Sequence, residues 1–200
     1  MALHAHVSVP WRRDRLGGTE GNELLTSATA LLLIGLLLAE GITVVHMRGL
    51  VGAHMFIGLA LIPPVLLKLS STGYRFFRYY SGSRAYREKG PPRTVLRMLA
   101  PVLVAATITM LATGVLLMAA GHKSGALLEI HKVSFIVFGV LFAVHFLAYL
   151  PRVARALGGA WRASGHVPGG GIRGALVTAA AGGGVALALS LLPAIDAWRA

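Results

Sequence analysis

The chain has 200 residues, of which 56% are hydrophobic and 13% charged, with a mean hydropathy of +0.71. Water-soluble domains are about 45–50% apolar and about 25% charged, so this chain has too little polar surface to cover a soluble globule. Its net charge is +12, but the basic residues lie in connections between apolar runs, which argues against a nucleic-acid-binding face. The absence of cysteine excludes disulfides, iron–sulfur clusters and covalently attached c-type haem.

Five apolar segments follow one another along the chain, at about residues 24–45, 50–69, 95–120, 126–150 and 172–195. Each has roughly the ~20 residues that a helix needs to cross ~30 Å of hydrocarbon. Helices are expected rather than strands, because no segment shows the ten-residue alternation of a barrel. The sequence therefore predicts an all-α integral membrane protein, with a four-helix transmembrane bundle and one accessory C-terminal transmembrane helix.

The domain organisation follows from these segments. We expect a cytoplasmic tail over 1–23, the bundle over 24–152, a cytoplasmic linker over 153–171, and the fifth helix with a short outer tail over 172–200. The tail, the second connection and the fourth connection hold 15 of the 19 Lys and Arg residues. The positive-inside rule then places the N-terminus in the cytoplasm and the C-terminus outside. The Ala-, Gly- and Arg-rich composition is typical of a bacterium, so the plasma (inner) membrane is expected.

Two local features of the second segment predict that it is not a straight helix that ends at the membrane surface. Pro63 and Pro64 remove backbone donors in its middle and predict a kink. An aromatic and arginine-rich stretch follows it and is typical of a membrane-surface anchor; a docking site for a cytoplasmic partner is the alternative. The aromatic residues of this stretch are Tyr74, Phe76, Phe77, Tyr79 and Tyr80.

Three of the eight histidines fall within the predicted spans: His54, His131 and His145. An ionisable side chain inside a membrane is costly and is usually satisfied by a partner or a cofactor. His131 and His145 are 14 residues apart, about 1400° of helical rotation, so they share one face at a separation of about 21 Å. His54 and His131 lie at matched depth near the outer side. This pattern favours a pair of axial ligands for a haem within the bundle.

Two stretches of sequence carry a resemblance to a known family. The segment IHKVSFIVFGVLFAVHFLAYLPR around His131 and His145 resembles the fourth helix of four-helix membrane b-type cytochromes, which include the cytochrome b of bc complexes and small bacterial relatives. The segment HMRGLVGAHMFIGLALI around His54 resembles their second helix. The resemblance covers about residues 24–152. It implies haem b held by histidines of the second and fourth helices.

The chain departs from that family at one position. The family has two histidines in each of these helices, whereas here Lys68 stands 14 residues after His54. Lys68 could be a snorkelling interfacial lysine with His145 as a structural histidine, Lys68 or another group could be an unusual sixth ligand, or an inner haem could be held by His145 alone. One haem is therefore better supported than two.

Other residues are expected around the outer haem. Gly41 and Gly114 lie at about the depth of His54, and the related cytochromes carry glycines at such positions; ordinary glycine-rich helix packing is the alternative. Arg48 or Lys132 could pair with haem propionates. Glu40, Glu129 or His46 could carry protons for a quinone or form a docking face, unless together they are only a solvated rim.

The function that this pattern favours is an electron-transfer subunit of a membrane oxidoreductase, which relays single electrons through haem between a quinol or protein donor and a redox partner. The expected partners are membrane lipid, a quinone and a redox protein, and not nucleic acid. No catalytic triad, hydrolase metal motif or phosphate-binding loop is present to suggest a stand-alone enzyme. A non-haem structural or transport-related membrane protein is the alternative, and the matched depth of the histidines is what distinguishes the two.

Overall fold

The computed structural model describes residues 17–91, 94–120, 125–163 and 167–199, and within these ranges the chain is helical and has no strand. Five of its helices are long and apolar enough to span a membrane, the fourth over Gly125–Pro151. This confirms the predicted all-α membrane bundle with an accessory fifth span. The helices are α1 (Gly18–Val45), α2 (Met47–Tyr80), α3 (Arg84–Glu88), α4 (Thr94–Ala120), α5 (Gly125–Ala163), α6 (Gly170–Ser190) and α7 (Leu192–Arg199).

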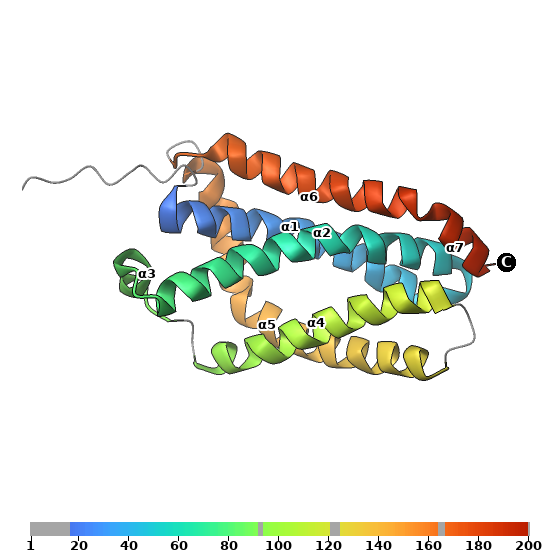
Figure 1. The fold of residues 1–200 in the computed structure, drawn as a ribbon. Coiled ribbons are helices and arrows are strands. Elements are labelled where there is room, and N and C mark those ends of the chain that lie inside the picture. The colour runs from blue at the N-terminus through green and yellow to red at the C-terminus, as the bar shows by residue number, and fades with distance from the viewer. Residues whose placement is uncertain (1–16, 92–93, 121–124, 164–166, 200) are drawn as a thin grey trace, which may run out of the picture.

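The spanning helices form two closely packed antiparallel pairs. α1 packs along α2, and α4 packs along α5, whereas the two pairs meet through far fewer contacts. α6 lies along the first pair, mainly on α2, and α4 and α5 lie on the opposite side of the bundle (Figure 1). α3 lies at one end of the bundle, which we call the inner end, and the α1–α2 turn and α7 lie at the other, which we call the outer end (Figure 1).

Two helices are longer than their apolar runs. α2 has 34 residues and a length of about 51 Å, which exceeds the ~30 Å hydrocarbon core. The predicted aromatic anchor is therefore the last turns of α2, where the Phe76 and Phe77 side chains are 62% and 66% exposed. α5 continues to Ala163 and so takes up much of the predicted 153–171 linker.

The prolines of α2 do not break the helix where the sequence predicts a kink. Pro63 and Pro64 keep helical φ and ψ angles, and the only non-helical residue inside α2 is Leu50, with φ −119° and ψ 16°. Pro64 cannot donate a hydrogen bond to the carbonyl of Ala60. Gly184 of α6 packs directly on that carbonyl oxygen, in space that a Cβ at position 184 would fill. α6 thus packs against α2 at the carbonyl group that has lost its hydrogen bond to the proline, and α2 continues through this region as a helix.

The outer end of the bundle is closed by α7. The predicted fifth span to residue 195 is interrupted at Leu191, since Pro193 lacks the N–H that would bond to Leu189 in a continuing helix. The chain turns there, and Ile195 of α7 becomes 2% exposed against Leu59, Ala60 and Ala188. This small core fixes α6 and α7 to the outer half of α2.

Candidate functional site

His54 of α2 and His131 of α5 face each other in the outer half of the bundle. Their ring centroids are 6.3 Å apart, and the ring planes are inclined by 78°. The backbones of α2 and α5 themselves hardly approach each other, so the two imidazoles extend toward one another from separate helix pairs. The matched depth expected from the sequence thus corresponds to a direct juxtaposition of these two side chains.

A carboxylate of α1 holds the His54 ring. The Glu40 side chain is 13% exposed, and its Oε1 lies 2.9 Å from His54 Nδ1. The Thr43 hydroxyl lies 3.3 Å from the same nitrogen, 2.7 Å from the Glu40 carbonyl and 3.2 Å from Glu40 Oε2. A carboxylate accepts hydrogen bonds but does not donate them. His54 therefore donates through Nδ1–H to Glu40, while Thr43 donates to Glu40.

The backbone of α4 holds the His131 ring. His131 Nδ1 lies 3.0 Å from the carbonyl oxygen of Met110 and 3.1 Å from the hydroxyl of Thr113. Because a carbonyl can only accept, Nδ1 of this ring also carries its proton. Gly114 lies beside the ring, since a Cβ at that position would stand 3.2 Å from His131 Cε1. Each histidine is thus oriented by the other helix of its own pair.

Both rings therefore hold the same tautomer. The hydrogen bonds of His54 and His131 with other described residues run through Nδ1, so in the neutral form of each ring Nε2 carries the lone pair. Protein imidazoles that ligate metals usually donate their other ring N–H to a carboxylate or a backbone carbonyl. A transition metal binds imidazole nitrogen at about 2.0–2.1 Å, so two imidazoles on opposite sides of one metal have centroids roughly 6–6.5 Å apart. The observed 6.3 Å lies within that range.

His145 lies on the same face of α5 nearer the inner side, and its environment differs. Its ring centroid is 4.7 Å from that of Tyr149, and its Nδ1 is buried without a hydrogen-bond partner among the described residues. Phe138 and Phe142 stack on one another between the levels of His131 and His145. No second imidazole faces His145 in the described part of the bundle, in contrast to the outer pair.

Lys68 belongs to a set of hydrogen bonds that ties α1 to α2. Its Nζ donates to the carbonyl of Thr26 at 2.8 Å. Asn22 Nδ2 donates to the Ser71 carbonyl at 3.1 Å, and the Thr26 hydroxyl donates to the Ser71 hydroxyl at 3.1 Å. We call these four residues the inner clasp. The Lys68 ammonium thus has a protein partner on α1, although it also lies within electrostatic range of His145.

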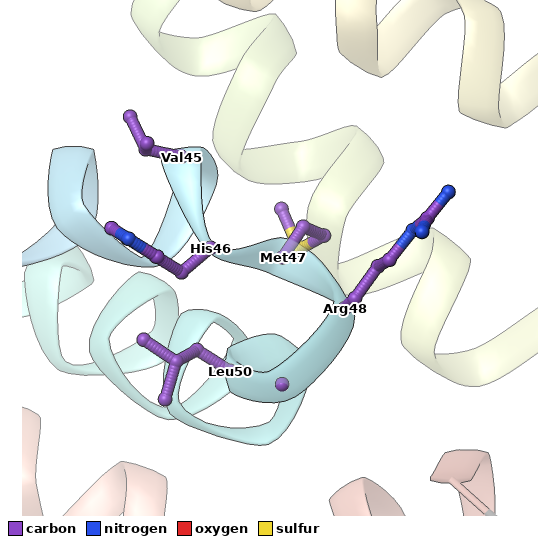
Figure 2. Close-up of a pocket in the computed structure, with 6 residues that line it drawn as sticks. Val45, His46, Met47, Arg48 and Leu50 are labelled. Atoms are coloured by element: carbon purple, nitrogen blue, oxygen red, sulfur yellow. The ribbon is translucent and has the colours of Figure 1, made fainter.

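The remaining expected site residues lie toward the outer rim. Arg48 is exposed in the α1–α2 turn and lines a surface hollow of about 550 Å³ formed by residues 45–50 (Figure 2). The Lys132 ammonium pairs with Glu129 at 3.0 Å, and both side chains are more than half exposed. Gly41 is exposed, with no atom within 4 Å of the place a Cβ would take. No hydrogen bond or ion pair links these residues to the two imidazoles in the described part of the chain.

Sequence reasoning placed Glu40 in a polar outer rim and did not anticipate the partners of the two rings. Thr43 and Thr113 are polar residues within apolar runs, and both are buried at the histidine level. Their sequence signal is a hydroxyl side chain within the apolar runs of α1 and α4, the helices that neighbour those of the histidines. The Met110 carbonyl has no sequence signal, because every residue carries such a group.

Comparison with known proteins assigns no family to the chain, since it matches no protein-family model, no curated protein and no solved structure. Among the described residues, no group of three or more His, Cys, Asp or Glu side chains is arranged to hold a metal ion. A hydrolytic metal centre of that kind therefore has no support in the described part of the chain, and what remains at the site is the pair of imidazoles.

Proposed function

We propose that the chain is a membrane electron-transfer subunit that binds one haem b between His54 and His131. The observation that carries this proposal is the opposed imidazole pair, with centroids 6.3 Å apart and both Nδ1 atoms held by the protein. A haem iron takes only two axial ligands from protein, because the macrocycle supplies the other four. A pair of histidines is therefore sufficient, and a three-residue metal cluster is not needed.

The surroundings of the pair suit a flat macrocycle. The two helix pairs make few contacts with one another, and Gly114 leaves the side of the His131 ring unobstructed. Apolar side chains of α2 and α5 would exclude water from the site, and Arg48 at the outer rim is available for a propionate. When bound, haem supplies a one-electron carrier whose potential depends on its axial ligands and on the dryness of its surroundings.

The inner half of the bundle has no pair of facing histidines like His54 and His131 among the described residues, so we propose a single haem. Lys68 is engaged with Thr26 in the inner clasp, and His145 faces no second imidazole among the described residues. A quinol or a redox protein would exchange electrons with the haem from the outer rim, where the polar groups surround the histidine pair. We also propose that the N-terminus and the basic α2–α4 connection are cytoplasmic, in a plasma membrane.

The ligand assignment is tested by replacing each histidine in turn. We expect His54→Ala and His131→Ala to lower the haem content of the purified protein by at least about tenfold, since losing even an outer-shell partner of a metal ligand costs 10–100-fold in affinity. His46→Ala is the matched control, because the ring of this exposed histidine, just after α1, bonds to the Ile42 carbonyl and to neither of the other two imidazoles among the described residues. Haem measured by the pyridine haemochrome should be retained in the control. Full haem content in both His54→Ala and His131→Ala would overturn the assignment.

A further inference from the structure

The two proposed ligands are held by groups of different charge. His54 donates to the Glu40 carboxylate at 2.9 Å, whereas His131 donates to the neutral carbonyl of Met110 at 3.0 Å. The carboxylate of Glu40 is 13% exposed and lies about 7–8 Å inside the outer end of α1. A carboxylate at such a place in a membrane helix is costly unless something compensates its charge.

The structure builds a specific place for this carboxylate. Thr43, one turn further along α1, lies 3.2 Å from Glu40 Oε2. On α2, a Cβ at Gly58 would stand 3.6 Å from Glu40 Oε1, so the carboxylate lies directly against this part of the helix. Oε1 of Glu40 thus lies beside His54 and Gly58, one turn apart on α2, while Oε2 lies near Thr43 of α1. Glu129, the other carboxylate near this end, is instead 67% exposed and paired with Lys132.

We propose that Glu40 is a positioning residue for His54, which fixes the ring's tautomer and lowers the reduction potential of the bound haem. This inference rests on the proposed function. A hydrogen bond from a ligand imidazole to a carboxylate raises the basicity of the ligating nitrogen. A nearby negative charge in a medium of low dielectric also favours the more positively charged, oxidised iron. Both effects act in the same direction, and the Met110 carbonyl on the other ligand has no charge to add.

The test compares midpoint potentials of the haem-loaded protein by redox titration of the α band. Glu40→Gln keeps a hydrogen-bond acceptor for His54 but removes the charge, so haem should be retained and the potential should move to more positive values. Glu40→Asp retains the charge and should stay closer to the wild type than Glu40→Gln does. Glu129→Gln, which removes an exposed carboxylate at the same end, should leave the potential unchanged.

The outcomes separate this inference from the proposed function. A potential for Glu40→Gln equal to that of the wild type, or an equal shift in Glu129→Gln, would overturn the role of Glu40 and leave the haem site standing. Wild-type protein without haem would instead overturn the proposed function. If Glu40→Gln cannot be purified, Glu40→Met serves in its place, because it also removes the charge of the carboxylate from the side of His54. The same positive shift is then expected, and no shift would contradict the proposal.

Discussion

At the scale of single residues, the ring of His131 leaves little room at position 114. A Cβ there would stand 3.2 Å from His131 Cε1, and the branches of a valine would reach further toward the ring. We predict that Gly114→Val turns the imidazole away from its present direction and lowers haem content by about tenfold, the order of loss seen when the support of a metal ligand is removed. Haem content per chain is the measurement.

Gly139→Val is the control for this change. Gly139 lies in another spanning helix, and nothing stands within 4 Å of the position of its Cβ. A similar loss of haem in both variants would indicate a general effect of valine on the bundle and would contradict the specific role of Gly114. Retention of haem in the control alone is the expected result.

Some residues of the site can be predicted from the sequence, and others cannot. His54, His131 and Gly114 are predicted from depth and spacing, because helical geometry converts sequence distance into position along the membrane. The bond from Glu40 to His54 is not predicted, since it depends on how α1 is rotated against α2. Spacing within one helix does not determine that rotation, which follows from packing between helices, including the fit of Glu40 over Gly58.

At the scale of helices, the inner clasp predicts how α1 and α2 respond to loss of Lys68. Methionine has a similar length and no charge, so Lys68→Met removes the bond to the Thr26 carbonyl. We predict unchanged haem content and a loss of stability of about 0.5–2 kcal/mol, in the range measured for hydrogen bonds in membrane helices. Haem counting together with thermal unfolding in detergent checks both parts.

Asn22→Ala is the matched variant in the same clasp, because it removes the neighbouring bond to Ser71 without changing charge. Comparable stability losses and full haem content in both variants are expected. Loss of haem, or a shifted spectrum, in Lys68→Met but not in Asn22→Ala would show that Lys68 is a ligand and would restore the alternative that the sequence left open.

The sequence predicts the spanning parts of the helices better than their ends. Hydropathy marks where a helix lies in hydrocarbon, but a helix can continue into water, because its backbone hydrogen bonds do not need apolar side chains. For this reason α2 extends to Tyr80 and α5 to Ala163, beyond their apolar runs. The course of α2 at its prolines also depends on residues distant in sequence: the helix continues through Pro63 and Pro64, and Gly184 of α6 packs on the carbonyl that Pro64 cannot use.

At the scale of the whole molecule, the proposed orientation can be tested without background labelling, because the chain has no cysteine. Gly49 lies in the first turn of α2, next to the end of α1, and Ser81 follows α2 at the opposite end; both are exposed. We predict that a membrane-impermeant thiol reagent labels Gly49→Cys in intact cells and labels Ser81→Cys only after lysis. The reverse pattern would contradict a cytoplasmic N-terminus.

The central claim is that the two helix pairs hold one haem between His54 and His131. A reduced-minus-oxidised absorption spectrum of the detergent-purified wild-type protein, with a pyridine haemochrome count, tests it most directly. We predict a sharp b-type α band and about one haem per chain, as expected for bis-imidazole ligation at a single level. Protein expressed with ample haem and purified without a Soret or α band would contradict the claim. The non-haem alternative, a structural or transport-related membrane protein, would then be the better account of the chain.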